Sequence, residues 1–563
     1  MHAEPVPDLQ PPVSHFAAMI HGHLAGLRAS QLKALERLNR RHVSPALAVT
    51  PELARELTEL SRELRRQLGL VLDRQGAVLH VVVGNDREIV LPDLADHALG
   101  RSGLRGLRCV HTHLKGEPLS QDDLNDLALL RLDLMVALAV GADGLPGAVH
   151  YAHLLPAALD GRVVETLQTA TVHGFNLDFA AFITGLDAEL ERTRAATVNL
   201  SDRREKAILI SITQAPRQEA DDALDELTEL ARTADVVVLD RVMQRPRQLN
   251  PRTLMGEGKL KEVVIRALQQ AATLLVFDQD LTPAQVRAIT ALTEIKVIDR
   301  SQLILDIFAR RAHTLDGKVQ VELAQLRYIL PRLTGKGTAM SRLMGGIGGR
   351  GPGETKLEID RRRIHERIAR LEKQLDNLGR GRRQRRHKRV SAGVPIVSIV
   401  GYTNAGKSTL LNALTQSEVF TEDLLFATLD TATRRLRFPR EREVIITDTV
   451  GFIRQLPKSL MGAFKATLEE LEDAHLLLHV VDIANPRCEE QIRAVERILR
   501  DLELHEIPRL LVFNKVDLVP GDVAAAMCRR HEALPVCARD RTTFEPLLRE
   551  LEERFWGLEE AEN

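Results

Sequence analysis

Residues 401–409 read Gly401-Tyr402-Thr403-Asn404-Ala405-Gly406-Lys407-Ser408-Thr409. The first eight fit the pattern G-x-x-x-x-G-K-[ST], with an apolar run at 396–400 before them and leucines at helical spacing after them. Such a loop turns backbone N–H groups toward phosphate oxygens, and the following helix adds its positive end. Lys407 supplies a charge at the β- and γ-phosphates, and Ser408 offers an oxygen to Mg²⁺. The context favours a phosphate-binding loop over a plain glycine turn.

Two further motifs follow strand-like runs, Asp448-Thr449-Val450-Gly451 and Asn514-Lys515-Val516-Asp517. Asp448 can hold Mg²⁺ through water, and Gly451 can present its N–H to a γ-phosphate. Asp517 can accept hydrogen bonds from guanine N1–H and from the 2-amino group. Adenine lacks both donors, so the three motifs together predict a guanine-nucleotide site.

These motifs resemble the translation-factor-like branch of the P-loop GTPases, and 426–430 resembles a first switch segment. The resemblance implies GTP or GDP as ligand, Mg²⁺ held by Ser408 and Thr428, and catalysis by Lys407, Thr428 and Gly451. A base-side loop is implied at 537–539, where Ala538 N–H can still reach guanine O6 although the usual Ser-Ala-Lys is absent. The implied nucleotide contacts are Gly401, Tyr402, Thr403, Asn404, Ala405, Gly406, Lys407, Ser408, Thr409, Phe426, Ala427, Thr428, Leu429, Asp430, Asp448, Thr449, Val450, Gly451, Asn514, Lys515, Val516, Asp517, Cys537, Ala538 and Arg539.

The residue after the second motif is Phe452, where many GTPases carry a glutamine that orients water. A phenyl ring cannot polarise water, so we expect slow intrinsic hydrolysis. Arg434, Arg454 or a group on a partner could supply charge at the γ-phosphate. The alternative is that both arginines simply face solvent.

Strand-like and helix-like runs alternate over 206–300 and again from 394, which predicts an α/β fold with parallel sheets. We expect an extra N-terminal α/β domain at 1–200 and an α/β subdomain at 205–300. A long helical hairpin with a Gly-rich tip loop should follow at 301–379, and a P-loop GTPase domain at 394–557. The basic run at 380–389 is expected to end the helix and to serve, within 380–393, as a linker.

The middle third resembles the HflX GTPases. The runs that carry this resemblance lie at 256–259, 299–312, 320–326, 330–333, 341–348, 350–358 and 360–363, and the likeness covers about 205–557. It implies a GTPase switch that binds the large ribosomal subunit, its RNA and proteins, and acts in ribosome dissociation, rescue or recycling.

A Gly-rich loop at 345–353 with Arg342, Arg350 and Lys356 nearby suits the phosphates of structured RNA. The basic run 380–389 could add to it, or could be only a solvated linker. Aromatic residues are 3% of the chain, which favours phosphate and shape recognition over base stacking. A nucleotide-gated adaptor that works through its N-terminal domain is the alternative function, and an ATP- or GTP-driven RNA remodeller is a third.

Within the N-terminal block, His111-Thr112-His113 followed by Ser120 and Asp123 resembles the zinc motif of JAMM-type metalloproteases. The gap from His113 to Ser120 is one residue short of that pattern, and Gln67 stands where a general-base Glu is expected. The alternative is a metal-free relic or a chance cluster, and protease activity is not inferred.

The 563 residues carry 77 basic and 78 acidic side chains, so the chain as a whole is not a polybasic nucleic-acid binder. Its four cysteines form no CxxC pair, which fits a reducing cytosol. We expect a monomeric cytoplasmic protein with partial membrane association, with no signal peptide, no integral membrane segment and no DNA partner.

Overall fold

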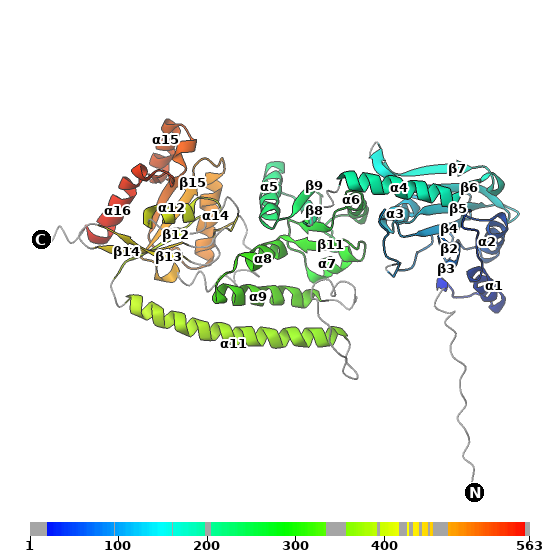
Figure 1. Ribbon diagram of the computed structural model, residues 1–563, viewed down its shortest axis with the longest axis horizontal. Coiled ribbons are helices and arrows are strands. Elements are labelled where there is room, and N and C mark those ends of the chain that lie inside the picture. The colour runs from blue at the N-terminus through cyan, green and yellow to red at the C-terminus, as the bar shows by residue number, and fades with distance from the viewer. Residues whose placement is uncertain are drawn as a thin grey trace, which may run out of the picture. The chain divides into compact units, whose positions relative to one another are not determined.

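The computed structural model describes residues 20–94, 96–159, 162–197, 204–333, 356–390, 394–415, 425–426, 432–438, 442–448, 451–453 and 471–557. The chain forms two compact units (Figure 1). The first comprises residues 1–203, 256–273 and 292–295, and the second comprises 204–255, 274–291 and 296–563. Each is described by itself.

The first unit is built on a seven-stranded mixed sheet of order β1-β3-β2-β4-β5-β6-β7. Its strands are β1 (Ile20–Gly22), β2 (Leu68–Asp73), β3 (Val78–Val83), β4 (Leu107–His113), β5 (Leu134–Val140), β6 (Pro146–Leu159) and β7 (Arg162–Thr169). Its helices are α1 (Ala29–Asn39), α2 (Pro51–Leu64), α3 (Gln121–Leu129), the 3₁₀ turn η2 (Val172–Gly174), α4 (Phe179–Thr197) and α6 (Glu257–Gln269). β2, β4 and β5 are almost entirely buried, which explains the apolar runs of β2 and β5, whereas β4 also buries Arg108, His111, Thr112 and His113. Ile265 of α6 joins the core of this unit.

The second unit contains a parallel four-stranded sheet of order β11-β10-β8-β9. Its strands are β8 (Lys206–Ile212), β9 (Val237–Gln244), β10 (Leu274–Phe277) and β11 (Lys296–Asp299). The helices α5 (Arg217–Thr233) and α7 (Pro283–Thr290) accompany it. The alternation of apolar runs and helical segments therefore gives the parallel sheet that it predicts.

The second sheet of this unit has six strands in the order β13-β14-β12-β15-β16-β17, with only β13 antiparallel. The strands are β12 (Ile396–Val400), β13 (Ala432–Arg437), β14 (Glu443–Asp448), β15 (Leu476–Asp482), β16 (Arg509–Asn514) and β17 (Leu534–Pro535). The helices are α12 (Lys407–Thr415), α14 (Cys488–Asp501), α15 (Gly521–His531) and α16 (Glu545–Trp556), with the 3₁₀ turns η4 (Leu471–Asp473), η5 (Val516–Leu518) and η6 (Arg541–Phe544). The motif loops follow β12, β14 and β16, so they meet at one edge of the sheet.

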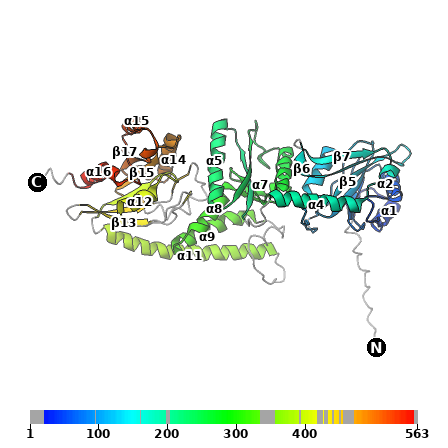
Figure 2. The ribbon, with the colours of Figure 1, turned by 45° about the horizontal axis from the view of Figure 1, so that its top comes forward.

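In sequence, four elements come between the two sheets: α8 (Arg300–Arg311), α9 (Leu315–Ile329), the 3₁₀ turn η3 (Leu330–Arg332) and α11 (Lys356–Val390). Figures 1 and 2 show α9 and α11 side by side. Leu371 packs against Leu323, and Arg361 donates to the Leu333 carbonyl at 3.1 Å, so the two helices run in opposite directions.

The expectation that the helix ends before residue 380 is wrong, because α11 continues to Val390. Arginine, lysine and glutamine are strong helix formers, so a run of them extends a helix rather than stopping it. The basic run 380–389 is therefore helical. The predicted tip loop at 345–353, with Arg342 and Arg350, lies outside the described residues.

Candidate nucleotide site

The loop between β12 and α12 is held in a tight turn by its own backbone. Asn404 and Gly406 have φ values of +61° and +88°. A Cβ at Gly406 would come within 2.3 Å of Asn514 Nδ2, so no other residue fits there without displacing that side chain. The loop closes on itself, because Lys407 Nζ donates to the Tyr402 carbonyl at 2.9 Å.

Lys407 is buried at the first turn of α12, and burial lowers the pKa of its ammonium to about 8, against the opposing effect of Asp448. Ser408 Oγ lies 2.5 Å from Asp448 Oδ2, and the register of β12 and β14 places Asp448 beside Ile399. A hydroxyl and a carboxylate oxygen meeting at a helix start are the hard donors that Mg²⁺ takes. These residues fit a magnesium ion.

The segment after the second motif is bonded to the phosphate loop through its backbone. Phe452 N donates to the Gly401 carbonyl at 3.1 Å, and Thr403 N donates to the Phe452 carbonyl at 2.7 Å. A Cβ at Gly451 would lie 2.9 Å from Lys407 Nζ and 2.7 Å from Thr403 Cγ2. Gly451 therefore faces the lysine at a distance that only glycine allows.

Asn514 joins the phosphate loop to the base-side loop. Its amide Nδ2 donates to the Ala405 carbonyl at 2.9 Å, and its Oδ1 accepts from Ala538 N at 2.9 Å. Lys515 Nζ pairs with Asp482 at 2.7 Å, at the end of the neighbouring strand. Sequence reasoning assigned Asn514 only to the nucleotide and missed this bracing, because its partners lie 109 and 24 residues away.

We expect Asn514→Ala to weaken the fold around the site and the affinity for GDP together. Asn514 is 1% exposed, so the substitution leaves two buried backbone groups without a partner, at about 1–3 kcal/mol each. Thermal unfolding and a GDP titration measure the two effects. The partly exposed Asn485→Ala serves as the control, and equal behaviour of the two variants would contradict the bracing role.

Asp517 and Cys537 come together on the base side of the site. Burial, and a hydrogen bond to the Asp517 carboxylate, raise the pKa of the Cys537 thiol. Asp517 itself is exposed on η5, next to the loop whose Ala538 N–H is held by Asn514. The exposed carboxylate can offer an acceptor to the edge of a base. The Ala538 N–H, predicted to reach guanine O6, instead donates to Asn514 Oδ1 in this structure.

The site also contacts the four-stranded subdomain of the same unit. The Tyr402 hydroxyl donates to Glu226 of α5 at 2.7 Å, and Arg300 pairs with Glu226 at 3.0 Å and with Asp278 at 3.1 Å. Burial alone would lower the pKa of the Arg300 guanidinium, but the two carboxylates outweigh it, so the pKa of Arg300 is raised. The sequence carries no signal for this network, because its members are spread over 177 positions from 226 to 402.

Phe426, predicted as a nucleotide contact, has its side chain in the core. It is 2% exposed and lies edge-on to Phe308 of α8, with 4.7 Å between ring centres. Only its backbone is left to face a ligand. Arg434 donates to the Thr433 carbonyl at 3.0 Å from β13. Some positions predicted to contact the nucleotide or to supply charge lie outside the described residues. They are Ala427, Thr428, Leu429, Asp430, Thr449, Val450 and Arg454.

Three family models match adjoining stretches of the chain. They are a GTP-binding GTPase N-terminal region at 221–309, a GTP-binding GTPase middle region at 311–389 and a 50S ribosome-binding GTPase at 396–515. A solved GTP-binding protein from Sulfolobus solfataricus in complex with GDP is 24% identical, with a TM-score of 0.33, and covers 62% of this chain and 96% of that chain.

Curated relatives are more similar than that structure. The chain is 50% identical over 320 residues to GTPase HflX of Caldanaerobacter subterraneus, covering 57% of this chain and 74% of the relative. It is 44% identical to GTPase HflX of Lacrimispora saccharolytica, covering 65% and 88%, and 46% identical to that of Escherichia coli, covering 56% and 74%. The chain therefore belongs to the HflX family of GTPases, enzymes that hydrolyse GTP.

Proposed function

We propose that the protein is a GTP-driven switch that binds the large ribosomal subunit in its GTP form and acts in ribosome dissociation, rescue or recycling. The observation that supports a nucleotide-dependent switch is the pair of hydrogen bonds by which Asn514 connects the phosphate loop to the base-side loop. The description of the family model that matches 396–515, a 50S ribosome-binding GTPase, supports the ribosome as partner. The proposal takes the protein as a monomer in the cytoplasm.

In this proposal water attacks the γ-phosphate, while Lys407 and the Gly451 N–H stabilise charge on the phosphate oxygens. Ser408 and Thr428 would hold Mg²⁺, with the Asp448 carboxylate beside Ser408. When bound, Mg²⁺ neutralises charge on the β- and γ-phosphates. The group that we assign to guanine recognition is the Asp517 carboxylate, which accepts from the N1–H and the 2-amino group of guanine.

Hydrolysis on the isolated protein should be slow, because Phe452 is buried and offers no polar group to water. We therefore expect purified large subunits to stimulate multiple-turnover GTP hydrolysis, by at least about 10-fold if they supply or position a stabilising charge. Small subunits at the same concentration are the control. An unchanged rate with large subunits would contradict the ribosome as the activating partner.

Helix α11 is the candidate surface for ribosomal RNA. It carries 14 Lys or Arg and 5 Asp or Glu, and none of the acidic residues lies after Asp376. A helix end of this composition attracts phosphates, and each phosphate contact adds salt-dependent affinity.

Replacing Arg382, Arg383, Arg385 and Arg386 with Gln should weaken binding to large subunits. Glutamine keeps the helix, so the loss reports charge. If all four contact phosphates, the slope of log affinity against log salt should fall by about 3. The matched control replaces Arg493, Arg497, Arg500 and Arg529, which are exposed on α14 and α15. Equal losses in both variants would point to net charge rather than to this helix end.

An adaptor acting through the N-terminal unit is the second candidate. Deleting residues 1–203 would expose α6, whose Ile265 is buried in the core of that unit, so a truncation would not test it cleanly. The four-arginine α11 variant, made in the full chain, separates the two functions. An adaptor that acts through the N-terminal unit would still bind its main protein partner when these arginines are replaced. In the described part of the chain, no helix has the length and apolar character needed to cross a bilayer.

A further inference from the structure

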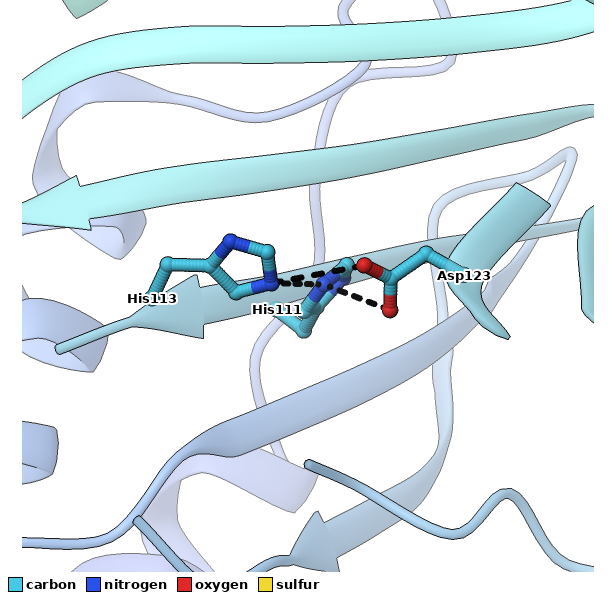
Figure 3. A group of neighbouring side chains, drawn as sticks. All are labelled: His111, His113 and Asp123. Atoms are coloured by element: carbon cyan, nitrogen blue, oxygen red, sulfur yellow. Dashed lines mark hydrogen bonds and ion pairs between the residues drawn. The ribbon is translucent and has the colours of Figure 1, made fainter. Parts of the chain in front are cut away.

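Three side chains with metal-binding atoms converge in the N-terminal unit, far in sequence from the nucleotide motifs (Figure 3). His111 and His113 alternate on β4 and so face the same side of the sheet. Asp123 comes from the first turn of α3, which begins just after that strand. Both imidazoles are buried, at 0% and 3% exposure, and the Asp123 side chain is 13% exposed.

The distances within this group are close to the edges of a coordination tetrahedron. His111 Nε2 lies 3.0 Å from His113 Nε2 and 3.3 Å from Asp123 Oδ1, and His113 Nε2 lies 3.5 Å from Asp123 Oδ2. Zinc bonds of about 2.0–2.1 Å at tetrahedral angles separate neighbouring ligand atoms by about 3.3–3.5 Å. The two imidazole nitrogens and the Asp123 carboxylate therefore lie close to the spacing of three ligands around one ion, which leaves a fourth position for another ligand.

Neighbouring groups hold two of these side chains in the orientation that a metal ion needs. His113 Nδ1 lies 2.8 Å from the Glu117 carbonyl, which fixes the proton on Nδ1 and leaves the lone pair of Nε2 facing the group. Asp123 Oδ2 accepts from the backbone N and the Oγ of Ser120, both at 2.7 Å. A lone pair and a carboxylate directed at one buried point require a cation or a proton between them.

Gln67, on the same face of the sheet, supplies an independent sign that a further ligand binds near this group. Gly69 pairs with His111 across β2 and β4, so Gln67, two residues earlier, lies on the same face and opposite His113. Gln67 is 1% exposed, and its Nε2 is buried without a hydrogen-bond partner among the described residues. A buried amide donor in that state is costly unless something bound beside it accepts the hydrogen bond.

We propose that His111, His113 and Asp123 bind one Zn²⁺ ion, with the fourth position left for an oxygen ligand that accepts from Gln67 Nε2. Two imidazoles and one carboxylate favour zinc over Mg²⁺ or Ca²⁺, which prefer sites made of oxygen alone. The Gln67 amide cannot act as a general base. These residues therefore support metal binding, with Gln67 as a neutral hydrogen-bond donor, and not hydrolysis. This site is separate from the nucleotide site and does not rest on the proposed ribosomal function.

The test measures zinc binding by the full chain after treatment with a chelator. Mg²⁺ and GDP are kept in excess so that the nucleotide site is filled, and Zn²⁺ is titrated against a chromophoric chelator. We expect one Zn²⁺ per chain. Asp123→Asn and His113→Gln should each weaken binding by at least about 100-fold, because losing a ligand costs more than losing an outer contact. Asp123→His should restore binding, since imidazole is itself a zinc ligand.

The control is His80→Gln in the same unit. His80 lies 3.0 Å from His21 in a second histidine pair, which belongs to no three-residue ligand group in the described chain. Zinc binding should survive this change. GDP affinity and thermal unfolding report whether each variant folds.

Two results would overturn the proposal. One is substoichiometric zinc in the wild-type chain, which would leave the three side chains as a hydrogen-bonded cluster that shares a proton. The other is wild-type affinity in folded Asp123→Asn. If the variants do not fold, Co²⁺ loaded into the wild-type chain decides, because a tetrahedral site with two nitrogen ligands gives intense visible absorption and an absent spectrum contradicts it.

Discussion

Replacing Lys407 with alanine is expected to abolish stable GTP binding while leaving the fold intact. The ammonium is buried and its pKa is lowered to about 8, so the nucleotide-free protein gains little from keeping a charge there. In the proposed nucleotide complex the same charge would lie against the β- and γ-phosphates, where charge-assisted hydrogen bonds contribute about 1.5–3 kcal/mol each. Losing two of them predicts a fall in affinity of about 10²–10⁴-fold.

Thermal unfolding with and without GTP measures this effect. A ligand at 100 times its Kd stabilises the folded state by about 2.7 kcal/mol, so the wild-type chain should show a clear shift. Lys407→Ala should unfold near the nucleotide-free wild-type midpoint and show no shift. Arg493→Ala, an exposed cation on α14, is the control and should retain the shift. Unchanged GTP binding by Lys407→Ala would refute the phosphate-site assignment.

Asp517→Asn is expected to change which base the site prefers. Asp517 is exposed and accepts a hydrogen bond from the Cys537 thiol, which leaves its carboxylate further lone pairs for the edge of a base. The amide keeps one acceptor oxygen and places an N–H donor where the second carboxylate oxygen stood, so it faces one guanine donor with a donor and can donate to the 2-oxygen of xanthine. We expect GTP affinity to fall by about 10²–10⁴-fold, and XTP affinity to rise.

Competition of GTP, XTP and ATP against a fluorescent guanine nucleotide measures this preference. Asp522→Asn removes an exposed carboxylate five positions away on α15, and should leave the preference for guanine unchanged. If Asp517→Asn keeps the wild-type order of the three nucleotides, another group selects the base. Loss of binding to all three nucleotides would instead indicate that the substitution has damaged the base-side loop.

Local patterns predicted the features that depend on a few neighbouring residues. The apolar run before Gly401 and the leucines after Lys407 give β12 and α12 because both the strand and the helix bury those side chains. The helix at 380–390 was missed, because a charge run has no apolar periodicity even though its residues favour helix.

Contacts between distant residues could not be predicted in the same way. Asn514 braces Ala405, and Tyr402 bonds to Glu226, through hydrogen bonds that span 109 and 176 residues. Such pairings depend on how strands are ordered in the sheet, and a single sequence does not encode that order locally. The inward orientation of the Phe426 side chain could not be predicted either, because its packing partner Phe308 lies 118 residues earlier, on α8.

Co-sedimentation with purified large ribosomal subunits tests the central claim most directly. The full chain is pelleted with a non-hydrolysable GTP analogue or with GDP, at two salt concentrations. A GTP-gated ribosome factor that contacts phosphates should pellet more tightly with the analogue, and high salt should weaken that binding. Equal pelleting with both nucleotides, or none with either, would contradict the account and shift weight to an adaptor role of the N-terminal unit.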